Sequence, residues 1–239
     1  MEPLEKKALV KPGQPPSALK SASQFTSPRE GSGQDVLKPA RGKQKRLNAK
    51  LLKAARMGYS WAAEDLIAKG ADVDARDKAG VTVLMRAAVN GSMEIIKTLI
   101  AKGANVHAQA RDGRTALMRA VANDRLKAAE LLIDSGADMY TADNDGVSPV
   151  AFSVAEGRTE AVRMLIAKGA DVNAKDGDGW TLLMDAAAAG RTETAEMLIE
   201  RGADVNAASD CGGFTALNLA IWCCHKRTAE MLRMRGATE

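Results

Sequence analysis

A ten-residue phrase that recurs along the sequence constrains the fold more than any other feature. It reads LIAKGADVDA at residues 66–75 and returns with small changes until a shortened copy ends the chain at 232–239. The glycines of successive copies are 33, 33, 33, 33 and 34 residues apart. A fixed period of this size is typical of a solenoid, in which each unit buries its apolar face only against its neighbours. The repeat therefore predicts a function carried by a surface. The glycines are Gly70, Gly103, Gly136, Gly169, Gly202 and Gly236.

A second pattern runs in register with the first and predicts two helices in each unit. A Thr or Ser follows a glycine by two residues and precedes an apolar run, where its side-chain oxygen would cap the first helix. Pro149 falls at the first helical position, where a missing N–H is tolerated. The glycine of the repeated phrase comes after the second apolar stretch, where a left-handed residue ends a helix. The capping residues are Thr82, Thr115, Ser148, Thr181 and Thr215.

The amino-acid sequence at the start of the first helix of each unit resembles that of a known repeat family. The segments GVTVLMRAA at 80–88 and GWTLLMDAA at 179–187 resemble the T-P-L-H-x-A start of the ankyrin repeat, a unit of about 33 residues. The family's histidine is replaced here, and methionine is an unbranched apolar side chain that fits the same buried space. The resemblance implies an all-α ankyrin-repeat solenoid of helix-turn-helix units joined by β-turn or hairpin loops. The T-x-L-M motif and the alanine-rich helices resemble those of bacterial ankyrin-repeat proteins. The replacements are Met85, Met118, Ala151, Met184 and Asn218.

The chain divides into a tail and an array of repeats. Residues 1–43 hold six of the seven prolines, together with Ser, Gly and Lys, and such a composition predicts disorder. The array is predicted at 44–239, with helix beginning at about residue 47. Its units are an N-terminal capping repeat at 44–76, full repeats at 77–109, 110–142, 143–175 and 176–208, and a C-terminal capping repeat at 209–239.

The second helices are expected to bury one apolar stripe. An isoleucine recurs within it at intervals of 33 residues, and the last unit replaces that isoleucine with Arg233. Because the end of a solenoid must present a polar face, this replacement predicts a C-terminal cap. The isoleucines are Ile67, Ile100, Ile133, Ile166 and Ile199.

Charge separates the tail from the array. Residues 1–50 hold 11 Lys or Arg and 4 Asp or Glu. Residues 51–239 hold 23 Lys or Arg and 26 Asp or Glu. A mildly acidic array does not favour a nucleic-acid platform. The basic cluster at 38–46 is interpreted either as a solvated linker or as a contact for phosphates, anionic lipid or an acidic protein.

No catalytic, cofactor or metal site is predicted. The three cysteines cluster near His225 without a C-x-x-C motif, so reduced structural thiols are favoured over a metal site or redox switch. The segments at 143–146 and 176–179 resemble fragments of a calcium loop but lack its later glutamate, and are interpreted as turns. Phosphate-loop, nucleophile-elbow and H-E-x-x-H motifs are absent from the sequence, which predicts a protein that is not an enzyme. The cysteines are Cys211, Cys223 and Cys224.

The positions that vary between units indicate a binding face. In ankyrin proteins the exposed side of the first helices and the turn tips line a concave groove, so the resemblance implies a groove here. It would be basic over the first two full units, and acidic with aromatic residues over the last three. Exposed aromatic and arginine side chains are enriched in protein interfaces. The predicted partner-contact residues are Lys78, Val81, Arg86, Asn90, Arg111, Arg114, Arg119, Asn123, Asp145, Phe152, Glu156, Asp178, Trp180, Asp185, Phe214 and Trp222.

These observations favour a non-enzymatic scaffold or adaptor that binds a protein or peptide segment in the groove. The alternative is a tether in which the basic tail binds nucleic acid or a membrane surface while the repeats recruit a protein. A third hypothesis is the regulatory subunit of an enzyme. The absence of a long apolar run and of a secretory signal predicts a cytoplasmic monomer without a membrane span.

Overall fold

The computed structural model describes residues 41–238, and these residues fold as six pairs of helices. Within this range the strand-like contacts are three isolated bridges between turn residues. The all-α repeat fold is therefore as predicted. The helices are α1 (Arg41–Met57), α2 (Ser60–Ala68), α3 (Val83–Asn90), α4 (Met93–Ala101), α5 (Ala116–Ala122), α6 (Leu126–Asp134), α7 (Pro149–Ala155), α8 (Thr159–Ala167), α9 (Leu182–Ala188), α10 (Thr192–Glu200), α11 (Ala216–Trp222) and α12 (Lys226–Met234).

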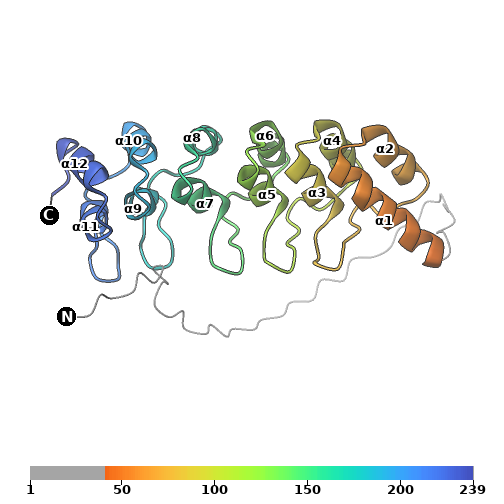
Figure 1. Cartoon of the computed structure of the whole chain (residues 1–239), viewed down its shortest axis with the longest axis horizontal. Coiled ribbons are helices and arrows are strands. Elements are labelled where there is room, and N and C mark those ends of the chain that lie inside the picture. The colour runs from red at the N-terminus through yellow and green to blue at the C-terminus, as the bar shows by residue number, and fades with distance from the viewer. Residues whose placement is uncertain (1–40, 239) are drawn as a thin grey trace, which may run out of the picture. The chain divides into compact units, whose positions relative to one another are not determined.

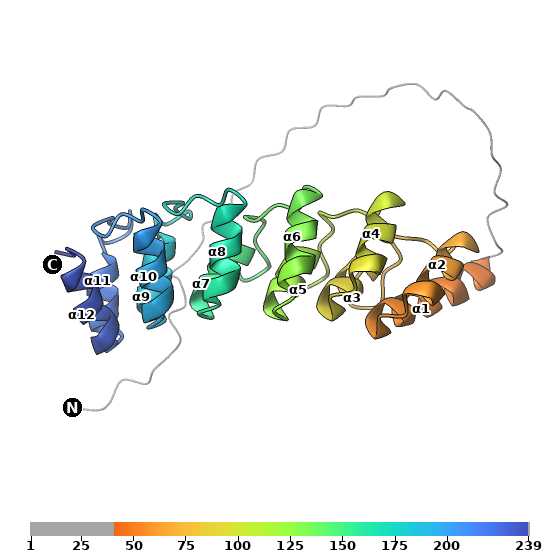
Figure 2. The ribbon, with the colours of Figure 1, turned by 90° about the horizontal axis from the view of Figure 1, so that it is seen from above.

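The helices of the array form two rows (Figure 1). Odd-numbered helices pack on one another to make the first row, and even-numbered helices make the second row. Long turns leave the first row on the side away from the second row, and Figure 2 shows the pairs following one another along the array. Side chains on the exposed side of the first row and on the turn tips can therefore reach a common partner.

The predicted caps are present at every first helix after α1. The Thr82 hydroxyl oxygen accepts the backbone N–H of Met85 at 3.2 Å, and the Met85 sulfur accepts the backbone N–H of Thr82 at 3.3 Å. In the last unit the Asn218 side-chain oxygen takes over the role of the sulfur, accepting the N–H of Thr215 at 3.2 Å. An acceptor thus remains at the position where the family carries histidine in four of these five units, and Ala151 is the exception.

Backbone hydrogen bonds also join the turns of neighbouring units. The N–H of Arg111 donates to the carbonyl of Ala79 at 3.0 Å, and the N–H of Asn144 donates to the carbonyl of Asp112 at 3.2 Å. The turn tips at Arg111, Asn144 and Asp210 are therefore each held by the preceding turn.

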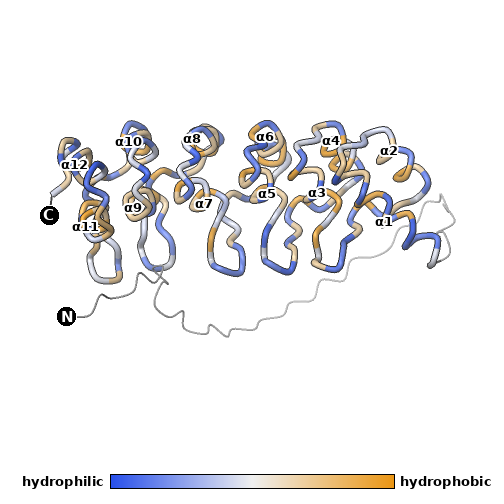
Figure 3. The backbone as a smooth tube through the Cα atoms, in the orientation of Figure 1, coloured by the Kyte–Doolittle hydropathy of each residue, from blue (hydrophilic) through white to orange (hydrophobic). Residues whose placement is uncertain are grey.

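The apolar core lies between and along the two rows, while the turns are polar (Figure 3). The leucine of the repeated phrase is fully buried in the middle of the array, as at Leu132 and Leu165. The adjacent isoleucine is not: Ile133 is only half-buried and contacts two core clusters, one on each side of the junction between the 110–142 and 143–175 units. The predicted apolar stripe is therefore buried at its leucine, whereas its recurring isoleucine is only partly buried. Arg233 is exposed at the end of the array.

The array begins earlier than predicted. Helix α1 starts at Arg41, within the segment assigned to the tail and six residues before the expected first helical residue. Its register is set by Gln44, whose side-chain amide donates to the carbonyl of Gly70 at 2.8 Å. The predicted disorder of the tail concerns residues that lie outside the described range, apart from 41–43, which are helical.

Substitution of Asp124 by glycine is expected to stabilise the array by about 0.5 kcal/mol or more. Asp124 has a φ of +56°, and the equivalent position is Gly91 or Gly157 in neighbouring units, with φ of +77° and +68°. A side chain in this left-handed region is strained, and glycine removes that strain. Urea unfolding monitored by circular dichroism measures the change. An unchanged or lower midpoint would show that the aspartate is not strained there.

Candidate functional site

The residues predicted to contact a partner lie on the first row of helices and on the turn tips, a surface that we call the first-row face. Fifteen of the sixteen predicted contact residues are at least partly exposed there. Val81 is the exception: it is 5% exposed, so its assignment to partner contact is wrong. Its backbone carbonyl closes the turn by accepting the N–H of Asp77 at 3.0 Å, and its side chain belongs to the core.

The arginines of this face are engaged by aspartates of the turns. Arg86 binds Asp77, and Arg119 binds both carboxylate oxygens of Asp112 at 2.8 and 3.0 Å. The Arg114 Nε reaches Asp143 at 3.4 Å. The first two full units are therefore less basic than their composition predicts, because three of the five basic side chains on this face pair with aspartates. Lys78 and Arg111 remain exposed at the tips.

These ion pairs lower the pKa of two turn carboxyls. Burial raises the pKa of the Asp77 carboxyl, but hydrogen bonds from Arg86 and from the backbone N–H groups of Val81 and Ala79 outweigh burial and hold the pKa below its ordinary value of 3.8. The pKa of Asp112 is lowered in the same way, since the N–H of Arg114 and the charge of Arg119 outweigh the effect of burial.

The stability of the array is therefore expected to fall in acid. A carboxyl with a depressed folded pKa stabilises the fold fully above its unfolded pKa, and this contribution is lost as the pH falls through the folded value. Urea midpoints measured from about pH 7 to pH 2 should be level above about pH 5 and decline below about pH 4. The Asp77→Asn variant should decline less steeply. If the two proteins have identical pH profiles, the Asp77 carboxylate makes no pH-dependent contribution to the stability of the array.

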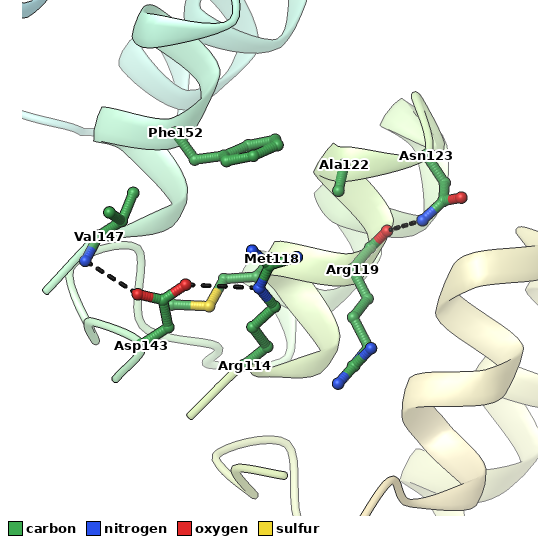
Figure 4. A pocket seen from close by; sticks show the side chains of 8 residues that line it. All are labelled: Arg114, Met118, Arg119, Ala122, Asn123, Asp143, Val147 and Phe152. Carbon is green, nitrogen blue, oxygen red and sulfur yellow. Dashed lines mark hydrogen bonds and ion pairs between the residues drawn. The ribbon is translucent and has the colours of Figure 1, made fainter. Parts of the chain in front are cut away.

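A pocket opens on the first-row face between α5 and α7 (Figure 4). Its volume is about 60 Å³, several times the space that one water molecule needs. The Phe152 ring lies on the α7 side, Asn123 and Arg119 come from the end and middle of α5, and Arg114 binds Asp143 at the turn side. The pocket can therefore accept a partner's side chain. The lining residues are Arg114, Met118, Arg119, Ala122, Asn123, Asp143, Val147 and Phe152.

Sequence reasoning predicted four of these residues and missed others. Arg114, Arg119, Asn123 and Phe152 were predicted as partner contacts, and the structure brings them together around one pocket. Met118 was assigned to the core and Asp143 to a turn, and Asp143 indeed holds its turn by accepting the N–H of Val147 at 3.0 Å. Nothing in the spacing of the repeats distinguishes Asp143 from the other turn aspartates.

The 143–175 unit creates the pocket because it departs from its neighbours. Phe152 stands where the preceding units carry Arg86 and Arg119. Arg125 bonds through its Nε to a carbonyl of the preceding unit at 3.2 Å, but the Nε of the equivalent Arg158 is buried and has no hydrogen-bond partner within residues 41–238. Its guanidinium instead lies 6.0 Å from the centre of the Phe152 ring. The two core clusters also meet at this junction.

Arg119 has spare hydrogen-bonding capacity at the pocket. Its pairing with Asp112 uses one terminal nitrogen for both bonds, while its Nε is buried without a partner among the described residues. A buried donor that lacks an acceptor costs free energy. A carbonyl or carboxylate oxygen entering the pocket would supply that acceptor.

Aromatic residues define the far end of the first-row face. The Phe214 and Trp222 rings meet edge to face with centres 5.9 Å apart, and Trp222 is 69% exposed. Trp180 and Phe214 each follow a turn glycine in adjacent units, which predicts a contact between them, whereas the ring contact within residues 41–238 is between Phe214 and Trp222. Trp180 is half-buried against the second core cluster. Of the two tryptophans that were predicted to contact a partner, Trp222 is therefore the better candidate.

The cysteines and carboxylates form no evident metal centre. Cys211 and Cys224 are exposed and Cys223 is half-buried, and all three are free thiols. No group of three or more potential metal ligands occurs in the described part of the chain. Among helices α1–α12, none is long and apolar enough to cross a membrane.

Comparison with known proteins agrees with this architecture. The profile for ankyrin repeats (3 copies) matches residues 51–143 and 150–238. The chain belongs to the ankyrin repeat family, whose members generally mediate protein–protein interaction and are typically not enzymes. No curated protein is significantly similar in sequence.

Two solved structures illustrate the similarity. One is a chain from the complex of the Bd0816 predatory endopeptidase from Bdellovibrio bacteriovorus with the immunity protein Bd3460; it is 31% identical, with a TM-score of 0.67 over 77% of this chain and 97% of that one. The other is the ankyrin repeat domain of human ASB11, which is 26% identical, with a TM-score of 0.68 over 79% of this chain and 84% of that one.

Proposed function

We propose that this protein is a non-enzymatic binding module that holds a protein partner along its first-row face, with the α5–α7 pocket as a central subsite. The observation that carries the proposal is the pocket itself. It combines an apolar wall at Phe152 with the buried, unpartnered Nε of Arg119. Well-packed pockets that accept one anchor side chain are the usual centres of binding energy in protein interfaces.

The chemistry of the pocket defines the group that it would accept. The Phe152 ring would cover an apolar stem, and Arg119 with the partly exposed Arg114 would bind an oxygen at its end. The Asp143 carboxylate is 6% exposed and already accepts hydrogen bonds from the backbone N–H groups of Asp145 and Val147. These N–H groups, together with the charge of Arg114, offset the repulsion between this carboxylate and an entering oxygen. A Glu or Gln side chain of the partner fits this arrangement.

The similar chain from the endopeptidase–immunity protein complex supports a folded protein as the partner. That structure is a protein–protein complex, and the similarity covers nearly all of the matching chain. We infer that this chain, too, engages a folded protein through its repeats rather than a small molecule.

Affinity capture tests this proposal. The full-length chain, its Phe152→Ala variant and a Lys97→Glu/Lys127→Glu variant of the second-row helices α4 and α6 are immobilised in parallel, and bound proteins are quantified by mass spectrometry. A partner is expected on the parent and on the second-row variant, and is expected to be depleted on Phe152→Ala. Equal capture by all three proteins would show that the first-row face is not the binding site.

A further inference from the structure

Helix α1 carries an unusual distribution of charge. Residues 42–57 include six Lys or Arg and no Asp or Glu, and all six of these basic side chains are exposed. Four of them recur at spacings of three or four residues, which places them on one face of the helix, and Met57 continues the same stripe. We call these residues the α1 basic stripe. They are Lys43, Arg46, Lys50, Lys53 and Met57.

The opposite face of α1 supplies the contacts that fold it onto the array. Leu51 and Ala55 are fully buried there. Gln44 donates to the carbonyl of Gly70, and the side-chain oxygen of Asn48 accepts the N–H of Asp72 at 3.0 Å. The stripe therefore contributes nothing evident to folding and is free to meet a partner.

The stripe also lacks counter-charges. Several basic side chains elsewhere in the array are paired, as Lys168 is with Asp134 at 2.8 Å and Arg235 is with Glu196 at 2.6 Å. Among residues 42–238, no ion pair involves a basic side chain of the α1 basic stripe. A run of unpaired cations attracts an anionic surface.

Exposed apolar side chains lie at the end of this stripe. Met57, Tyr59 and Trp61 are 47%, 57% and 80% exposed, and they extend from the last residue of α1 to the first turn of α2. Trp61 occupies a position at which every other unit has a charged residue, such as Glu94 or Lys127. We call Met57, Tyr59 and Trp61 the apolar corner. Neither packing nor the repeat pattern explains an exposed tryptophan there.

We propose that the α1 basic stripe and the apolar corner dock this protein on an anionic lipid surface. Lys and Arg side chains near such a surface are attracted by its negative potential, and Trp and Tyr prefer the boundary between headgroups and acyl chains. The apolar residues favour lipid over nucleic acid as the partner. They gather at one end of the stripe instead of alternating with its cations, and Met57 offers no ring on which a base could stack. The stripe lies on α1, at one end of the first row, whereas the pocket of the proposed function lies between α5 and α7, so the two sites can be tested separately.

Vesicle sedimentation of the full-length chain tests the proposal. The protein should bind vesicles of phosphatidylcholine containing about one-third phosphatidylserine, and binding should weaken when salt is raised from about 0.05 to 0.5 M. Vesicles of phosphatidylcholine alone should bind it poorly. Lys50→Glu/Lys53→Glu should weaken binding to the anionic vesicles about tenfold or more. Lys97→Glu/Lys127→Glu, which makes the same change of charge on α4 and α6, should weaken binding much less.

Two substitutions at Trp61 test the contribution of the apolar corner separately from that of the α1 basic stripe. Trp61→Glu restores the residue type found in other units, so the fold should be retained while vesicle binding falls about fivefold or more. Tryptophan emission of the parent should shift to shorter wavelength on anionic vesicles, and Trp61→Phe should remove most of that shift although Trp180 and Trp222 remain.

Three outcomes would overturn the proposal. One is sedimentation that does not depend on phosphatidylserine. Another is equal loss of binding in the α1 and in the α4 and α6 charge variants, which would indicate a general effect of net charge. The third is tighter binding, at the same salt concentration, to duplex DNA or RNA than to the anionic vesicles, which would assign the stripe to nucleic acid.

Discussion

Replacement of Leu132 by alanine is expected to lower the free energy of unfolding by about 2–5 kcal/mol, the range for deleting a fully buried leucine side chain. Leu132 is 0% exposed on α6, in the second of the four full units. Units of a solenoid are stabilised by contacts with their neighbours, so a cavity here weakens packing on both sides. Chemical denaturation followed by circular dichroism measures the loss.

Ile133→Ala is the matched comparison, because it shortens an adjacent side chain on the same helix. Ile133 is half-buried, so its truncation should cost clearly less than that of Leu132. If Ile133→Ala proves the more damaging change, the isoleucine rather than the leucine forms the main contact between units.

Replacement of Trp222 by alanine is expected to weaken binding of the natural partner by at least about 2 kcal/mol, or roughly thirtyfold. Trp222 exposes 69% of its surface, and Phe214 supports its ring from the turn of the same unit. A large exposed ring held in place by a second ring loses little conformational entropy on binding and can bury much apolar area. Titration calorimetry with the partner obtained by affinity capture measures the change.

Stability provides the control for this prediction. Because Trp222 is mostly exposed, Trp222→Ala should leave the thermal midpoint within a few degrees of the parent value. Trp180→Ala should instead lower the midpoint, since Trp180 is half-buried against the second core cluster. If a folded Trp222→Ala protein keeps full affinity for the partner, the aromatic pair of Phe214 and Trp222 is not part of the binding face.

Local rules made the fold predictable from the sequence. The caps at Thr82 and Thr115 and the left-handed glycines at Gly70 and Gly103 depend on interactions within a few residues, and all four have the predicted conformation. The period of the repeat then fixes which helices are neighbours. The start of α1 was misplaced because no turn glycine precedes it, and because Gln44 and Asn48 anchor it through contacts with the distant residues Gly70 and Asp72.

The site was less predictable because it depends on contacts between units. Val81 was assigned to a turn tip, yet its side chain turns into the core. Arg114 was treated as a free charge, although it pairs with Asp143, which is 29 residues away. The pocket arises where Phe152 replaces an arginine of the neighbouring units, and the sequence marks that substitution without showing that a cavity results.

Photo-crosslinking to the captured partner tests most directly whether binding occurs on the first-row face. A p-benzoylphenylalanine is introduced in place of Asn123, at the rim of the pocket, or in place of Lys127, which is exposed on α6 in the second row of the same unit. We expect the partner to crosslink efficiently from position 123 and not from position 127. Crosslinking from position 127 with none from position 123 would contradict a partner bound along the first row of helices.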